Sequence, residues 1–273
     1  MIQTSVIRGT GKLGDDVGYR RGKKLCFRKQ AKNVRRSEPT KEAATDFGTA
    51  SKAGKLIRRA VRQGLNIRTD NNLTNRLNAA LLNVLYGSSE KRGSRSFRRD
   101  NLPALAGFRF NMNTELSQLL DFQPKVVQDK KSLRIALPAL TAEDIHHSKN
   151  TSHVEIKAIA VNVNFNQGEY QDAATDKVMI DFRKPAEAKE LVLPFKAGED
   201  ETIVVLQVTA YHELNGKLYK VDNRKYFAAD IIDVIPSLPQ EDEVTNIIHH
   251  DQSGRHPLFR LHGDHTYAAP QRE

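Results

Sequence analysis

The sequence predicts an α+β protein, with a β-hairpin and two helices at the N-terminus followed by an antiparallel β-sandwich that is immunoglobulin-like in outline. Two observations predict this order. Apolar residues recur at helical spacing between residues 40 and 86, and from about residue 104 the apolar period changes to 2. Several short strands separated by turn signals are typical of sandwiches and barrels. We therefore expect three segments: 1–103 with the hairpin and helices, 104–236 as the sandwich, and 237–273 as an extended arm or tail.

Residues 12–29 predict the hairpin. Apolar side chains alternate with charged or small ones on both sides of Gly22, as in half-buried strands; they are Val17, Tyr19, Leu25 and Phe27. Gly22 lies where the turn is needed, because glycine adopts positive φ freely. Residues 30–39 then read as an extended basic linker that ends at Pro39.

Two helices are predicted, over 40–63 and 72–86, each followed by a glycine that ends it. Thr40 is the expected N-cap of the first helix. Its apolar stripe comprises Phe47, Ala50, Gly54, Ile57 and Val61, and its last turns hold cations that suit the helix dipole, namely Lys55, Arg58, Arg59 and Arg62. Both apolar stripes are narrow, so we expect them to be buried on the sandwich or on another subunit. Residues 87–100 read as an exposed loop.

Eight strands are predicted in the second half. The clearest signal is Asn215-Gly216, because a type I′ hairpin turn needs positive φ at both central residues. Residues 202–208 are apolar on both faces and predict a central strand. The expected strands are 106–111, 132–138, 153–165, 177–184, 190–195, 201–214, 217–222 and 226–235.

Charge is distributed unevenly along the 273 residues. The formal net charge is +10, yet residues 1–110 hold 25 Lys and Arg against 8 Asp and Glu, a net of +17, whereas the remainder is at −7. Such asymmetry predicts contact with nucleic acid or a membrane, or head-to-tail pairing between the basic part of one molecule and the acidic part of another.

The hairpin region is the strongest candidate for a binding site. Residues 15–36 contain nine Lys and Arg, with Tyr19 and Phe27 available for stacking; the nine are Arg20, Arg21, Lys23, Lys24, Arg28, Lys29, Lys32, Arg35 and Arg36. These cations suit a phosphate backbone, whose binding would depend strongly on salt. They suit an acidic protein partner as well, and a plain solvated face is the third explanation. No zinc-finger spacing or RNA-binding aromatic motif accompanies them.

No motif in the sequence predicts catalysis, so we expect no enzyme, no cofactor and no metal site. The glycines of residues 9–14 lack the spacing of a phosphate-binding loop. Cys26 has no histidine near it in sequence and reads as incidental. The histidines near the C-terminus match no zinc signature and read as part of a polar tail; they are His249, His250, His256, His262 and His265.

The remaining sequence features indicate the cellular compartment of the protein. A single cysteine fits a reducing environment, and the first residues lack the apolar core of a signal peptide. No window approaches 18 apolar residues, so we expect no membrane span. We expect a cytoplasmic protein at synthesis, with an extracellular or particle-associated position after release left open.

The opening of the chain resembles a family of uncharacterised bacterial proteins. The resemblance lies in GKLGDDVGYRRGKKLCFRKQAKNVRR followed by PTKEAATDFGTASKAGKLI, a basic, glycine-punctuated hairpin that leads into a helix begun by threonine. It covers about the first 65 residues well and the β-rich remainder in outline. It implies a bacterial source and this architecture, and it carries no activity.

These observations favour a non-enzymatic architectural protein that assembles with copies of itself, as a filament, a virion-like structure or a surface structure. A basic N-terminal element and an acidic sandwich suit head-to-tail contacts. The first alternative is a nucleic-acid-binding protein that uses the hairpin. A second alternative is a ligand-binding sandwich, against which the absence of tryptophan argues because sugar sites favour large aromatic surfaces.

Overall fold

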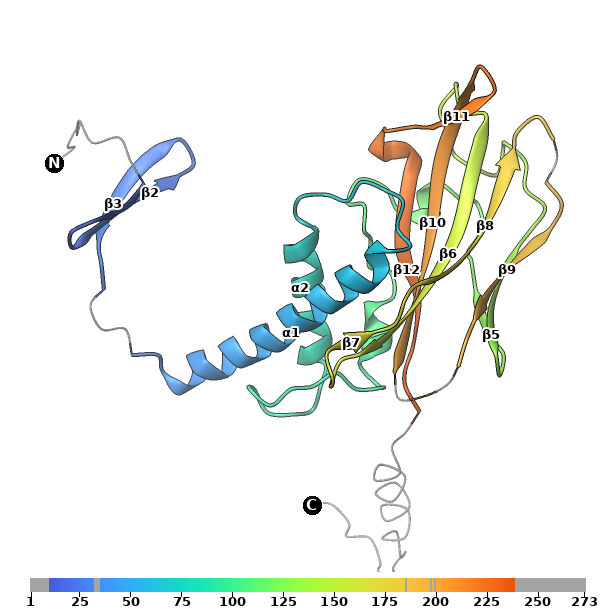
Figure 1. Cartoon of the computed structure of the whole chain (residues 1–273). Coiled ribbons are helices and arrows are strands. Elements are labelled where there is room, and N and C mark those ends of the chain that lie inside the picture. Colours follow the sequence, from blue (N-terminus) through green and yellow to red (C-terminus); the bar gives the residue numbers. More distant parts are fainter. Residues whose placement is uncertain (1–9, 32–34, 185, 197, 199, 239–273) are drawn as a thin grey trace, which may run out of the picture.

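A computed structural model describes residues 10–31, 35–184, 186–196, 198 and 200–238 (Figure 1). It confirms the predicted fold class: two helices and antiparallel sheets form an α+β arrangement that begins with an N-terminal hairpin. The predicted arm over 237–273 lies almost wholly outside the described residues. Within the described ranges, no helix is long and apolar enough to cross a membrane.

A six-stranded antiparallel sheet forms the centre of the protein. Its two long middle strands, β6 (His153–Asn164) and β10 (Glu201–Leu214), pair along eleven residues. The far edge of β10 pairs with β12 (Phe227–Ile235) and β11 (Lys217–Lys220). The far edge of β6 pairs with β8 (Ala174–Asp181) and β7 (Glu169–Tyr170). β10 is therefore the central strand that residues 202–208 predict, and the turn at Asn215-Gly216 has positive φ at both residues.

One face of this large sheet is covered by a smaller antiparallel sheet. Its order is β4 (Val126–Gln128), β5 (Ser132–Leu137) and β9 (Lys189–Pro194). Side chains that alternate inward along β5 and β9, such as Leu133 and Leu191, share a core with Ile156 and Leu206 of the large sheet. The backbone N–H of Val192 donates to the Asp176 carboxylate at 2.8 Å, which joins β9 to β8 at one side of the sandwich.

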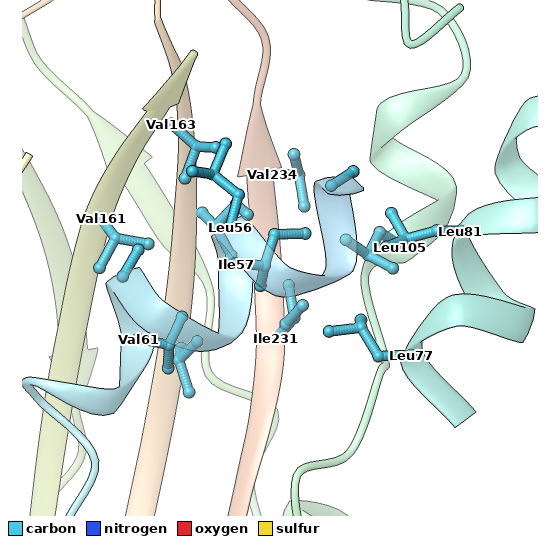
Figure 2. Packing of buried hydrophobic residues seen from close by; sticks show 14 of the residues in the cluster. Leu56, Ile57, Val61, Leu77, Leu81, Leu105, Val161, Val163, Ile231 and Val234 are labelled. Atoms are coloured by element: carbon cyan, nitrogen blue, oxygen red, sulfur yellow. The ribbon is translucent and has the colours of Figure 1, made fainter. Parts of the chain in front are cut away.

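The two helices cover the opposite face, so β6 and β10 are buried on both sides. Figure 2 shows Leu56, Ile57 and Val61 of α1 (Glu38–Arg62) between the sheet and α2 (Leu73–Tyr86), with Val161 and Val163 of β6 beside them. The apolar stripes of the helices were expected to be buried either on the sandwich or on another subunit, and in the structure they are buried on the sandwich. A short 3₁₀ helix, η1 (Leu102–Leu105), completes this second core.

The first helix differs from its prediction at its N-terminal end. It begins at Glu38 with Ser37 as N-cap, so Pro39 and Thr40 lie in its first turn rather than in the linker or at the cap. Proline fits there because the first helical N–H groups have no partner within the helix. Phe47, predicted to be buried, is 53% exposed, and Asp46 is buried in its place.

Asp46 is buried because the loop of residues 87–100 folds back over α1. The Asp46 carboxylate accepts from the Gly93 N–H at 2.9 Å and pairs with Arg95 at 3.0 Å. Phe97 packs on Phe165 with ring centroids 5.0 Å apart. The predicted exposed loop is therefore held to the body of the protein in its second half.

The predicted strand over 106–111 is an irregular edge segment. The Gly107 and Phe110 N–H groups donate to carbonyls of β12, at 2.7 and 2.8 Å, and a single bridge joins Arg109 to Asp230. The other predicted strands are present, with ends shifted by up to three residues. The sequence pattern did not predict β4 or β7, which are only three and two residues long.

The N-terminal hairpin carries a third strand. β2 (Asp16–Arg21) and β3 (Lys24–Lys29) pair around the predicted turn, where Gly22 has a φ of +63°. β1 (Gly11–Leu13) adds to the outer edge of β2. In Figure 1 this small sheet, β1–β3, stands away from the helices and the sandwich. It is called the N-terminal sheet below.

Candidate polyanion-binding surface

The N-terminal sheet presents two different faces. Residues that lie directly opposite in an antiparallel pair project to the same side, and the register pairs Tyr19 with Cys26 and Gly18 with Phe27. Tyr19 and Phe27, the two predicted stacking residues, therefore lie on opposite faces and do not form one platform. The Arg28 guanidinium lies 5.8 Å from the Tyr19 ring centroid, a cation–π contact within the Tyr19 face.

The predicted basic residues are divided in the same way. Arg21, Lys24 and Arg28 share the face of Tyr19, whereas Arg20 and Lys29 share the face of Phe27. Lys23 lies in the turn, Arg35 and Arg36 lie just before α1, and Lys32 lies outside the described residues. The eight described cations are all exposed, and none of them pairs with a carboxylate in the described ranges.

A second basic surface lies on α1, where the sequence pattern was interpreted only as favourable to the helix dipole. Lys52, Lys55, Arg59 and Arg62 follow one another at intervals of three, four and three residues. That spacing places them on one side of a helix, and all four are exposed. The row spans about 15 Å at 1.5 Å per residue. The spacing itself is the signal that would have identified this surface from the sequence.

Two neighbouring cavities open along this row. The first has a volume of about 580 Å³ and includes Lys55, Arg58, Arg59 and Arg62 among its lining residues. The second, of about 550 Å³, is lined by Lys52, Lys55 and Arg59 together with Phe97 and Phe165. The two cavities share Lys55 and Arg59 in their linings, and the pair is here called the α1 groove. No Asp or Glu of the described residues lines either cavity.

Packing beneath the α1 groove is tight and leaves one cation without a partner. Burial lowers the pKa of Arg58 from its ordinary value, and its Nη1 atom is buried with no hydrogen-bond partner in the described part of the chain. A Cβ at Gly54 would lie 2.4 Å from Asn78 Oδ1 and 3.3 Å from Arg58 Nη1, so glycine is what lets α1 approach α2 here.

Several other arginines of the first half are paired with carboxylates. Arg76 pairs with Asp70 at 2.5 Å, Arg95 with Asp46 at 3.0 Å, and Arg98 with Glu90 at 2.5 Å. The Arg76 contact also lowers the pKa of Asp70, although burial opposes this. Among the described residues, the cations of the N-terminal sheet and of the α1 groove have no carboxylate partner, and the same holds for Arg68, Lys91, Arg92 and Arg99 outside them.

Glu155 and Asp230 are among the carboxylates that the structure buries and the sequence does not mark as buried. Glu155 of β6 is 3% exposed and pairs with Lys177 at 3.0 Å. Asp230 of β12 accepts from the Leu116 N–H at 2.8 Å, which ties η2 (Leu116–Gln118) to the sheet. Burial raises the pKa of Asp230 to about 6, against the lowering effect of that hydrogen bond. Both positions read as polar in the sequence, and no local pattern marks them as buried.

The remaining candidate residues do not form a reactive cluster in the structure. Cys26 is half-buried opposite Tyr19. His153 Nε2 lies 3.8 Å from Asp181, and His147 Nδ1 lies 2.7 Å from the Ile145 carbonyl. Among the residues that can be described, no three His, Cys, Asp or Glu gather in a way that could hold a metal ion. The C-terminal histidines lie outside the described residues.

No family model, curated protein or solved structure matches this chain.

Proposed function

We propose that this chain is a non-enzymatic architectural protein that assembles with copies of itself, and that the N-terminal sheet is the docking element. The observation that carries the proposal is that no described residue of the N-terminal sheet belongs to a hydrophobic core. Its strands are three to six residues long, and Leu13, Leu25 and Phe27 are 59%, 36% and 45% exposed on one face. Small sheets need an apolar face packed on something to be stable in water.

The partner that fits this face is a second copy of the chain. The exposed apolar side chains are flanked by Arg20 and Lys29, and residues 111–273 carry a net charge of −7. Apolar burial supplies the affinity, about 1.5–3 kcal/mol for each fully buried Leu or Phe side chain. Charge complementarity supplies orientation and speeds association.

Such a contact joins two different surfaces, the N-terminal sheet of one copy and the body of the next. Heterologous contacts of this kind generate a ring if the rotation closes and a filament if it does not. Either geometry is open to the N-terminal sheet, because it stands away from the helices and the sandwich in Figure 1.

Light scattering coupled to size exclusion, after nuclease treatment and at low and high salt, tests the proposal. We expect large particles at low salt that shrink as salt rises, because exposed charges are screened. Changing Leu25 and Phe27 to serine should abolish the particles. Reversing charge at Arg20 and Lys29 to glutamate, the two cations that flank this face, should do the same.

The control is Lys130→Glu with Lys131→Glu, in the exposed turn between β4 and β5, which should assemble as the wild type does. A wild-type chain that elutes as a 30.7 kDa monomer under both conditions contradicts the proposal. So does assembly that survives the serine variant.

A further inference from the structure

The α1 groove differs from the N-terminal sheet in having a defined shape. It is a pair of cavities of about 580 and 550 Å³ lined by five cations, and no described carboxylate shares its walls. A like-charged row on a helix destabilises it unless counter-charge is supplied. Within the described residues none of Lys52, Lys55, Arg59 and Arg62 has an ion-pair partner, so these four cations are available to a bound anion.

The form of the groove indicates a chain-like anion rather than a single phosphate. The four exposed cations are spread over about 15 Å of helix, and Lys55 and Arg59 line both cavities. A single small anion contacts two or three side chains at one point. A row of this length suits successive phosphates along a backbone, each held by one Lys or Arg.

An aromatic surface lies beside the cations. Phe97 and Phe165 are half-buried, pack on each other at 5.0 Å, and line the same cavity as Lys52, Lys55 and Arg59. Aromatic side chains next to a basic track are the combination that binds single-stranded nucleic acid, because every base can stack on a ring. A plain polyphosphate chain would gain nothing from these rings.

The wall that carries Phe165 is held in place before any ligand binds. Asn164 Oδ1 accepts from the N–H groups of Asn166 and Gln167, at 3.1 and 2.9 Å, and Gly168 has a φ of +74° that completes the turn. The Asn164 amide in turn donates to Asp200 at 3.0 Å. A preorganised wall of this kind reduces the entropy that is lost on binding.

We infer that the α1 groove binds a single-stranded nucleic acid segment, with phosphates on Lys52, Lys55, Arg59 and Arg62 and a base on the Phe97–Phe165 pair. This site is separate from the proposed assembly surface and does not depend on it. The bound segment of nucleic acid is short, because the row of cations ends where α1 ends. Recognition is independent of sequence, since it uses backbone phosphates and stacking.

Fluorescence anisotropy with a labelled oligo(dT) of about 12 nucleotides tests this inference. The groove variant Lys55→Glu with Arg59→Glu should weaken binding at least about tenfold and reduce the salt slope by about 1.4, at 0.7 for each phosphate contact. The control Lys130→Glu with Lys131→Glu makes the same change in net charge and should bind as the wild type does. Equal losses in both variants, or no loss in the groove variant, overturn the inference.

A second variant tests stacking separately from charge. Phe97→Leu keeps the cations and most of the apolar volume, so its thermal midpoint checks folding. It should lose about fivefold or more in affinity for oligo(dT) while its affinity for inorganic polyphosphate is unchanged. An unchanged oligo(dT) affinity would overturn the assignment to nucleic acid and leave a simple polyphosphate track.

The two proposals fail in distinguishable ways. Reversing charge at Arg20 and Lys29, which flank the docking face of the N-terminal sheet, should abolish assembly and leave a monomer whose groove still binds oligo(dT). If that variant assembles and yet binds no oligo(dT), the nucleic-acid site is the N-terminal sheet and the inference about the α1 groove is wrong. If the groove variant binds no oligo(dT) and assembles normally, the groove inference stands.

Discussion

At the scale of single residues, close approach explains several glycines better than turn geometry does. Gly64 follows α1, and a Cβ there would lie 2.5 Å from Ile159 Cγ2 and 3.2 Å from Thr175 Cγ2. Ile159 is fully buried in the middle of β6 and has no room to move. The chain can therefore leave α1 and pass over the sheet only if this position has no side chain.

Replacing Gly64 with alanine should lower the free energy of unfolding by about 1–3 kcal/mol, because an extra methyl in a packed core strains its neighbours. Gly48→Ala is the matched control, since Gly48 lies inside α1 with nothing within 4 Å of an added Cβ. That variant should gain about 0.5–1 kcal/mol from helix propensity. Urea unfolding measures both, and effects of the same sign in the two variants would contradict this account.

Asp230 makes stability depend on pH. Its pKa is about 6 in the folded protein and near 3.8 in the unfolded chain. Between these values the folded state holds a proton that the unfolded state has released, so the free energy of unfolding falls as pH rises. The contribution of Asp230 is thus greatest below about pH 4 and is lost above about pH 6, a change of about 3 kcal/mol.

Asp230→Asn removes this titration and keeps an oxygen that can accept from the Leu116 N–H. We expect the stability of the variant relative to the wild type to rise between pH 4.5 and 7, by about 2 kcal/mol. Urea unfolding across that range measures the difference. Parallel profiles for the two proteins would show that Asp230 does not titrate there.

At the scale of elements, the N-terminal sheet and the helix that follows it are stabilised by different means. α1 is held by a shared core and by Asp46, whereas the described residues of the sheet contact one another and leave both faces exposed. An element with so little buried surface opens locally at small free-energy cost. Its order in solution therefore depends on what covers it.

A chain that starts at Arg36 should fold as stably as the full chain at high salt, where assembly is screened. We expect its thermal midpoint to stay within about 2 °C, which corresponds to less than about 1 kcal/mol for a chain of this size. Differential scanning calorimetry measures it. A fall of more than about 5 °C would mean that the sheet packs on the body of its own chain.

At the scale of the whole molecule, the apolar periodicity predicted the positions of strands along the chain better than it predicted contacts between segments distant in sequence. β6 and β10 are found within one residue of their expected ends, because a period of 2 and the Asn215-Gly216 turn are local signals. Phe47 is exposed and Asp46 is buried because the partners of Asp46 come from a distant segment. A loop about 50 residues away supplies Gly93 and Arg95. Hydrophobicity alone does not report such a partner.

The candidate surfaces follow the same division. The positive charge of residues 15–36 is visible in the sequence, and so is the helical spacing from Lys52 to Arg62. The α1 groove is not visible, because Phe97 and Phe165 reach it from segments that are far apart in the chain. Its walls exist only once the helix layer lies on the large sheet.

The packing of the helices, the large sheet and the small sheet in three layers affects how the protein folds during synthesis. α1 and α2 leave the ribosome before the strands that cover them, which include Val163 of β6 and Val234 of β12. At about 5–20 residues per second, some 10–35 s of translation separate the end of α1 from the last of those strands. During that interval the nascent chain exposes two apolar helix faces beside a dense block of positive charge. We therefore expect the unfinished chain to be open to chaperones and to polyanions before the large sheet forms.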